Sequence, residues 1–241
     1  MLEGHEEQNE IPGKDALIEV RNLMKIYNPG ENEVRALNDV SLRIDRGEFV
    51  AIIGQSGSGK STFMNMLGCL DIPTSGSYYL NGNDVAGLSD DELSEIRNKE
   101  IGFIFQGFNL IPNLTALENV ELPLIYRNVP AAKRHEMSVE SLKRVGLENR
   151  MDHKPSEMSG GQQQRVAIAR ALAAAPPVIL ADEPTGNLDS ASSKEIMQIL
   201  RELHGEGRTV ILITHDNQIA ESANRVIRIM DGKIVSDTEK E

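Results

Sequence analysis

The sequence has one cysteine, no tryptophan and few aromatic residues of any kind. A single cysteine, Cys69, cannot form a disulfide within the chain and cannot supply the several thiolates of a cysteine zinc site. This composition fits a reducing compartment best, and we expect Cys69 to be a small core residue.

Acidic residues outnumber basic ones by 37 to 25, and long apolar runs are scarce. The formal net charge is −12, which argues against a nucleic-acid partner, because neutralising phosphates requires clustered Lys and Arg. The longest apolar runs, such as residues 178–181 and 210–213, are far shorter than the ~20 residues that span a bilayer. The acidic N-terminus lacks the pattern of an export signal. We therefore expect a cytoplasmic chain that reaches the inner face of the cell membrane only through a partner.

The patterning predicts an α/β protein with one folded unit at residues 17–235. Residues 1–16 and 236–241 are polar and are predicted to be tails. The expected strands and helices follow from turn residues, apolar runs and capping boxes such as Ser89 with Glu92. Antiparallel strands are expected at 17–27, 34–44 and 77–80, mostly helices at 89–165, and a parallel sheet with strands at 178–181, 209–213 and 226–230 around a helix at 190–204.

A phosphate-binding loop is the strongest single motif. Residues 54–61 read Gly-Gln-Ser-Gly-Ser-Gly-Lys-Ser, between an apolar run at 49–53 and a helix-compatible stretch at 62–67. Backbone N–H groups of such a loop turn toward one anion, and the helix adds the positive end of its dipole. Lys60 is expected to reach the terminal phosphates and Ser61 to hold Mg²⁺. A tight turn that binds nothing is the alternative, which the complete motif in its strand-loop-helix setting disfavours. The predicted nucleotide-binding residues here are Gly54, Gln55, Ser56, Gly57, Ser58, Gly59, Lys60, Ser61 and Thr62.

Two adjacent carboxylates end a later apolar strand. Asp182 and Glu183 follow residues 178–181, and chemistry often lies where parallel strands end. Asp182 is predicted to support Mg²⁺ and Glu183 to polarise the water that attacks the γ-phosphate. Taken alone, the two acids could equally cap the strand or pair with surface cations, but the phosphate loop upstream favours catalysis.

A second predicted anion cradle opens a helix at Ser159, Gly160, Gly161 and Gln162. The first N–H groups of a helix lack intrahelical partners and can bind an anion. An ordinary N-cap by Ser159 is the alternative. A cap does not need two glycines, each of which costs the helix about 1 kcal/mol relative to alanine.

With these three motifs the chain resembles the ATP-binding cassette ATPases, the nucleotide-hydrolysing subunits of ABC transporters. The resemblance covers residues 17–235, and its most specific mark is Met158-Ser159-Gly160-Gly161-Gln162, which is similar to the signature motif of that family. It implies a P-loop NTPase (RecA-like) core with an antiparallel β subdomain and an inserted helical subdomain at about 89–165.

The resemblance also assigns roles to four residues whose own patterns are weak. It implies that Gln106 contacts the metal and the attacking water, and that His215 contacts the γ-phosphate and supports Glu183. The segment Asn187-Leu188-Asp189 is similar to the loop that links paired sites, although Asp189 also suits N-capping of the following helix. Tyr27 is similar to the aromatic that stacks on adenine, and it lies on the more polar side of its strand.

In this family the signature segment faces the phosphate loop of a second copy. The resemblance therefore implies a Mg²⁺-dependent ATPase that closes head to tail as a homodimer around ATP and drives a separate membrane permease. The segment 102–120 and Gly68-Cys69-Leu70-Asp71 are similar to the branch serving macrolide exporters and lipoprotein-release complexes. That branch implies a permease with a large extracytoplasmic domain and an adaptor protein reached through it. Ile111, Leu114, Leu124 and Ile125 are candidate permease contacts, with packing inside the helical subdomain as the equal alternative.

Three other readings are weaker. A soluble ATPase of the same superfamily acting on DNA or ribosomes is expected to add coiled coils, zinc-binding cysteines or a second cassette, none of which is visible here. A small-molecule kinase or GTPase has no need of Ser159–Gln162 together with His215. A non-catalytic scaffold does not require Lys60, Asp182 and Glu183 at all.

Overall fold

The computed structural model describes residues 16–30 and 32–240. The tail predicted at residues 1–16 lies outside the described residues except for Ala16, which is buried and already belongs to the first strand. Within the described part of the chain, no helix is both long enough and apolar enough to cross a bilayer.

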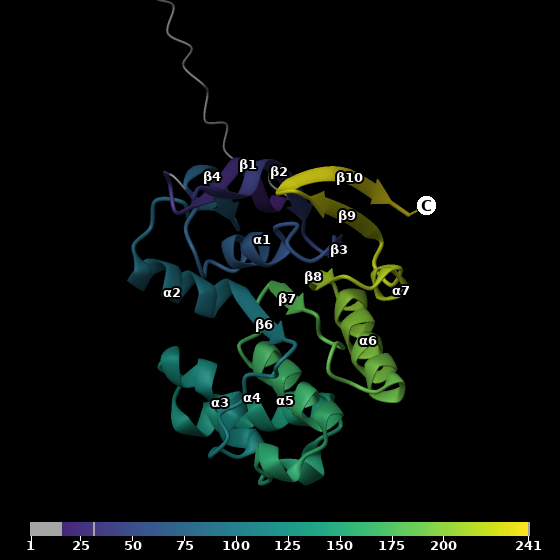
Figure 1. Cartoon of the computed structure of the whole chain (residues 1–241). Coiled ribbons are helices and arrows are strands. Elements are labelled where there is room, and N and C mark those ends of the chain that lie inside the picture. The colour runs from purple at the N-terminus through teal and green to yellow at the C-terminus, as the bar shows by residue number, and fades with distance from the viewer. Residues whose placement is uncertain (1–15, 31, 241) are drawn as a thin grey trace, which may run out of the picture.

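Two sheets and a group of helices make up the fold (Figure 1). The four-stranded antiparallel sheet has the order β2-β1-β4-β5, and the six-stranded sheet has the order β10-β9-β3-β8-β7-β6. Strands β9, β3, β8, β7 and β6 are parallel neighbours, while β10 runs antiparallel to β9. The strands are β1 (Ala16–Tyr27), β2 (Val34–Asp45), β3 (Phe49–Ile53), β4 (Ser75–Leu80), β5 (Asn83–Asp84), β6 (Ile101–Phe105), β7 (Val178–Asp182), β8 (Thr209–Thr214), β9 (Arg225–Met230) and β10 (Lys233–Glu239).

The helices divide between the two sheets and a separate helical lobe. In Figure 1, α3, α4 and α5 form the lobe at the end of the molecule remote from the antiparallel sheet, and α1 lies beneath that sheet. The helices are α1 (Lys60–Leu67), α2 (Asp90–Glu100), α3 (Ala116–Tyr126), α4 (Ala131–Arg144), α5 (Gly160–Ala173), α6 (Ser190–Gly205) and α7 (Asn217–Ala220), with short 3₁₀ turns at Glu148–Arg150 and Pro155–Glu157.

Strand β3 is buried on both faces, because it lies inside the parallel sheet. Phe49, Ala51 and Ile53 join the core that continues into α3–α6. Val50 and Ile52 join the second core, against α1 and the antiparallel sheet. Side chains alternate along a strand, so a continuous apolar run is needed when both faces are covered. The strand therefore ends in a rigid layer, and the phosphate loop begins directly after it.

Most predicted elements are confirmed. Ser89 and Thr115 cap α2 and α3 as the N-terminal halves of complete capping boxes. The turn at Asn81 and Gly82 has positive φ at both residues and joins β4 to β5. The range 89–165, predicted to be mostly helical, also contains β6 (Ile101–Phe105), which pairs with β7 inside the parallel sheet. The helical lobe therefore follows β6.

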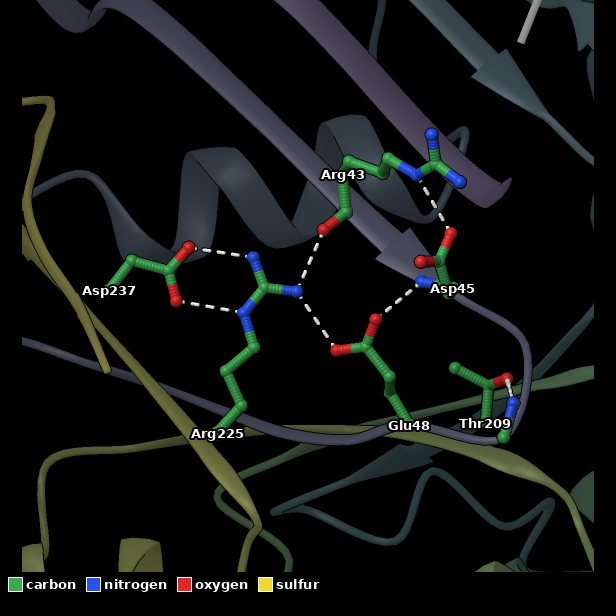
Figure 2. A network of polar contacts seen from close by, with 7 residues as sticks. Arg43, Asp45, Glu48, Thr209, Arg225 and Asp237 are labelled. Atoms are coloured by element: carbon green, nitrogen blue, oxygen red, sulfur yellow. Dashed lines mark hydrogen bonds and ion pairs between the residues drawn. The ribbon is translucent and has the colours of Figure 1, made fainter. Parts of the chain in front are cut away.

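The C-terminal tail predicted at residues 236–241 is also corrected, because residues up to Glu239 belong to β10. The strand is polar because it lies at the edge of the sheet and is mostly exposed, so it lacks an apolar pattern. Figure 2 shows what holds it: Arg225 of β9 donates to Asp237 at 2.6 and 2.8 Å. The same guanidinium donates to Glu48 at 2.9 Å and to the carbonyl oxygen of Arg43. These contacts join β10 and β9 to the turn before β3.

Candidate active site

The phosphate loop is shaped by two close backbone approaches that only glycine permits. A Cβ at Gly54 would lie 2.3 Å from the carbonyl oxygen of Ile229, and one at Gly59 would lie 2.4 Å from that of Ala36. Gly59 also has φ +101° and immediately precedes α1, with no side chain capping the helix. The first N–H groups of α1 are therefore free of a side-chain cap, as an anion site at a helix N-terminus requires.

Lys60 lies across this loop. Its Nζ donates to the carbonyl oxygens of Gly54 at 2.7 Å and Gln55 at 2.8 Å. Burial lowers the pKa of Lys60, while the charges of Glu183 and Asp182 raise it. The ammonium group is therefore held at the mouth of the loop, next to both carboxylates.

Glu183 is aimed by an unusual backbone conformation. Its φ is +44°, in the left-handed region that non-glycine residues rarely adopt. Its Oε1 accepts from the backbone N–H of His215 at 2.9 Å and lies 2.5 Å from His215 Nδ1, while Thr214 Oγ1 donates to Oε2 at 3.1 Å. Three groups from the end of β8 thus orient one carboxylate, and His215 itself is exposed.

Gln106 reaches the same place from the end of β6. Its Nε2 donates to Asn187 Oδ1 at 3.3 Å, and Asn187 Nδ2 donates back to the carbonyl oxygen of Gln106 at 3.0 Å. A Cβ at Gly186 would lie 2.5 Å from Gln106 Nε2, so the glycine leaves room for the amide.

These residues surround one cleft of about 1040 Å³. The structure brings together most of the predicted nucleotide and metal residues, including Gln106, Asp182 and His215. Ser58 is an exception, because it is buried and does not line the cleft. The residues lining the cleft are Val34, Arg35, Ala36, Ile53, Gly54, Gln55, Ser56, Gly57, Gly59, Lys60, Ser61, Thr62, Gln106, Asp182, Glu183, Ile213, His215, Asn217, Arg228, Asp231 and Gly232.

The signature segment lies outside this cleft. Ser159 caps α5: its Oγ accepts from the N–H of Gln162 at 3.3 Å, and Gln162 Oε1 accepts from the N–H of Ser159 at 2.9 Å. A Cβ at Gly161 would lie 2.6 Å from Ser192 Oγ of α6, so this glycine also has a packing reason that the sequence did not show. Ser159 is exposed and Gly160 partly exposed, and neither lines the cleft of its own chain.

Asp189 and Tyr27 also lie outside the cleft lining. Asp189 caps α6 by accepting from the N–H groups of Ala191 at 2.9 Å and Ser192 at 3.0 Å, as its capping alternative predicted. Tyr27 donates to Asp71 at 2.8 Å, and Lys25 Nζ lies 4.9 Å from its ring centre. The Tyr27 ring is therefore anchored beside the loop through Asp71.

Sequence reasoning missed several residues of the site. Thr214 ends an apolar strand and showed no signal except its position before His215. Arg228, Asp231 and Gly232 come from the β9–β10 hairpin, and Gly232 donates from its N–H to the carbonyl oxygen of Ser58 at 2.9 Å. Only the pairing of β9 with β3 brings that hairpin to the loop.

We expect Asp182 to make the nucleotide-free protein less stable near neutral pH. Its pKa is raised by burial and by the charge of Glu183, against the opposing effect of Lys60. A raised pKa in the folded state means that stability is fully present below the unfolded value and is lost as the pH rises through the folded value. We expect Asp182→Asn to raise the Tm of the nucleotide-free protein at pH 7, with a gain that shrinks on acidification. Thermal unfolding across pH measures this, with the exposed Asp152→Asn as control, and an unchanged Tm at pH 7 would contradict it.

The comparisons agree with this geometry. The model for the family described as ABC transporter matches residues 37–186. The chain is 54% identical over 224 residues to the macrolide export ATP-binding/permease protein MacB of Aggregatibacter actinomycetemcomitans, covering 93% of this chain and 35% of that protein. It is 53% identical over 225 residues to MacB of Neisseria meningitidis, again covering 93% of this chain and 35% of that protein. The chain thus spans about a third of the length of these curated relatives.

Solved structures share the whole fold. A dimeric structure of MJ0796, described as a bacterial ABC transporter cassette, is 51% identical with a TM-score of 0.85 and covers 92% of this chain and 98% of that one. A dimeric post-hydrolysis state of the ATP-binding cassette MJ0796 bound to ADP and Pi is 49% identical with the same TM-score and the same coverage. With the phosphate loop, both carboxylates, Gln106 and His215 around one cleft, the chain belongs to the ABC transporter family and is an ATP-binding cassette ATPase.

Proposed function

We propose that this cassette binds ATP in the cleft, closes head to tail with a second copy, and hydrolyses ATP to drive a membrane permease. The observation that carries the proposal is that one chain holds the cleft residues and the signature segment in two separate places. The phosphate loop, Asp182, Glu183, Gln106 and His215 border one cleft, while Ser159 stands exposed elsewhere on α5. A second anion cradle that its own chain does not use is explained if it serves the cleft of another copy.

The oxygen-bearing side chains near Lys60 fit a Mg²⁺ ion that binds together with a nucleoside triphosphate. Ser61, Gln106 and Asp182 present a hydroxyl, an amide oxygen and a carboxylate, the hard oxygen ligands that Mg²⁺ prefers. In the described part of the chain, no cluster of three or more His, Cys, Asp or Glu residues forms a metal cage. This fits an ion that keeps waters and phosphate oxygens as ligands. When bound, the ion neutralises charge on the phosphates.

Glu183 is the proposed general base. Its two oxygens accept three hydrogen bonds from Thr214 and His215, so its orientation is preset before substrate arrives. A carboxylate fixed in this way can take a proton from the attacking water, and His215 can reach the departing γ-phosphate from the end of the neighbouring strand β8. Lys60 and the first N–H groups of α1 stabilise negative charge on the phosphates. The Tyr27 ring, anchored by Asp71, is proposed to carry the adenine.

Closure of the dimer would place Ser159, Gly160, Gly161 and Gln162 of one copy against the phosphates held by the other. Asp189, before the start of α6, accepts from Ser192 Oγ at 2.7 Å, and Ser192 in turn packs against Gly161 of the signature helix. Hydrolysis turns one anion into two that repel, which opens the dimer. The dimeric MJ0796 structures, one bound to ADP and Pi, support this cycle.

The permease is proposed from the relatives and from exposed apolar side chains. The curated relatives are named as macrolide export ATP-binding/permease proteins. Ile111, Ile125 and Tyr126 are 46%, 45% and 77% exposed, beside or on α3. Leu124, another candidate contact, is fully buried inside the lobe and is excluded. We propose that the exposed residues contact a permease with an extracytoplasmic domain, itself bound to an adaptor, at the inner face of the cell membrane.

Capture of the full-length protein from membranes tests this partner. We expect the recovered complex to contain such a permease, and Ile125→Asp with Tyr126→Asp to reduce its recovery strongly while the ATPase rate of the isolated cassette is unchanged. Val235→Asp is the matched control, because Val235 is 47% exposed on β10. Recovery of ribosomes or DNA in place of a permease would overturn the transporter assignment.

A further inference from the structure

The segment that follows Gln106 contains two consecutive strained residues. Phe108 has φ +61° and Asn109 has φ +50°, and neither is glycine. The left-handed conformation costs about 1–2 kcal/mol per residue outside glycine, somewhat less for asparagine. Such a pair persists only where the surrounding structure holds it. The segment lies between Gln106 and α3, so whatever holds it also sets the position of Gln106.

Arg170 of α5 holds both residues through their carbonyl oxygens, while their own N–H groups donate to the carbonyl oxygens of Phe105 and Gly107. One terminal nitrogen of its guanidinium donates to the carbonyl oxygen of Phe108 at 2.9 Å, and the other donates to that of Asn109. Among the described residues, no carboxylate forms an ion pair with Arg170, and burial lowers its pKa. Arg170 is partly buried, and a partly buried cation without a carboxylate is costly unless its donors are satisfied. Here both carbonyls belong to the strained pair.

The same helix makes further contacts with the segment and with the backbone next to Gln106 and Glu183. The Phe108 ring lies 3.7 Å from the position of a Cβ at Gly160, in the signature segment. Gln164, fully buried, donates from Nε2 to the carbonyl oxygen of Pro184 at 2.6 Å and to that of Phe105 at 3.4 Å. Helix α5 therefore contacts the backbone on both sides of Gln106 and directly after Glu183.

We propose that Arg170 is a positioning residue, through which the helix that begins at Ser159 holds Gln106 at the cleft. The proposal rests on the proposed function, because Gln106 acts on the attacking water only in that reaction. Arg170 touches neither nucleotide nor water. It holds the strained carbonyls in place, so the signature segment and Gln106 move as parts of one body when the partner's nucleotide engages α5.

Arg170→Leu tests the inference. Without the guanidinium the strained pair relaxes, and the population with Gln106 in place falls. We expect kcat for ATP hydrolysis to drop about tenfold, the factor that corresponds to roughly 1.4 kcal/mol of released strain. KM for ATP and the affinity for nucleotide should change less than twofold, because Lys60 and the phosphate loop are untouched. Arg170→Lys, which keeps the charge but not the two-pronged geometry, should give an intermediate kcat.

Rescue by a second substitution distinguishes a positioning role of Arg170 from a general loss of stability. Glycine adopts positive φ without strain, so Asn109→Gly in the Arg170→Leu background should restore part of kcat, with the strain at Phe108 remaining. In the wild-type background Asn109→Gly should change kcat little. Arg127→Leu is the matched control, since Arg127 donates to the backbone carbonyls of Lys99 and Ala174, away from Gln106. It should lower the free energy of unfolding and leave kcat unchanged.

Two outcomes would overturn the inference. One is an unchanged kcat for a folded Arg170→Leu protein, and the other is a loss that Asn109→Gly does not restore. Failure of the proposed function is recognised separately, by normal hydrolysis in a Glu183→Gln protein. If Glu183→Gln abolishes hydrolysis while Arg170→Leu has no effect, the ATPase assignment stands and only the role of Arg170 is rejected.

Discussion

Replacement of Glu183 by glutamine is expected to slow ATP hydrolysis by about 10²–10³-fold while leaving ATP binding intact. Glutamine has nearly the same shape and can still accept from the N–H of His215, but its amide cannot take a proton from water. Because hydrolysis is the step that opens the dimer, the variant should accumulate in the closed state. Size-exclusion chromatography with MgATP should show a stable dimer, and without nucleotide a monomer.

The control for this substitution is Glu140→Gln, because Glu140 is an exposed residue of α4, remote in sequence from every cleft residue. It should hydrolyse ATP at the wild-type rate. A Glu183→Gln protein that stays monomeric with bound MgATP would reject the head-to-tail dimer. A protein that hydrolyses ATP normally would show that Glu183 is not the base, whatever the state of the dimer.

The second large effect is expected at Lys60. Lys60→Ala removes an ammonium group whose charge-assisted hydrogen bonds to phosphate are each worth about 1.5–3 kcal/mol, so we expect the affinity for ATP to fall about 100-fold. Isothermal titration calorimetry measures this directly. Lys99→Ala is the control, because Lys99 is exposed on α2 and pairs with Glu95. Unchanged affinity in Lys60→Ala would remove the phosphate-loop assignment.

Mixing two inactive proteins extends this test to the dimer. Lys60→Ala damages the phosphate loop, and Ser159→Phe damages the exposed helix start that is proposed to act on the partner. Each alone should be nearly inactive. In a mixed dimer, the intact loop of one copy meets the intact Ser159 of the other, so one complete site is restored and activity should reappear. Absence of recovery, with both proteins folded and dimerising, would place the signature segment outside the catalytic site.

Much of the site could be predicted because its residues occur in short, uninterrupted motifs. The phosphate loop and Asp182-Glu183 are local in sequence, and their chemistry needs consecutive residues. Gln106 and His215 were recognised only through resemblance, because a single polar residue after a strand carries no local signal. Thr214, which orients Glu183, looked like the last residue of an apolar strand.

The features that the sequence left undetermined have equally physical causes. β10 is an edge strand whose exposed face needs no apolar residues, so its polar composition resembled a tail. Gly161 is explained in part by the close approach of Ser192, a contact between residues far apart in the chain. Asp189 is engaged in capping α6, an alternative that the sequence left open.

The sequence by itself determined the family, the nucleotide and the order of the elements, because glycines, caps and apolar runs act over a few residues. Only the tertiary structure decided which residues meet. Parallel pairing of β6, β7 and β8 brings Gln106, Asp182 and Glu183 to one edge, where His215 follows β8. The left-handed backbone at Phe108 and Asn109, and the Arg170 guanidinium that holds it, arise from contacts more than 60 residues apart. No local pattern encodes contacts of that range.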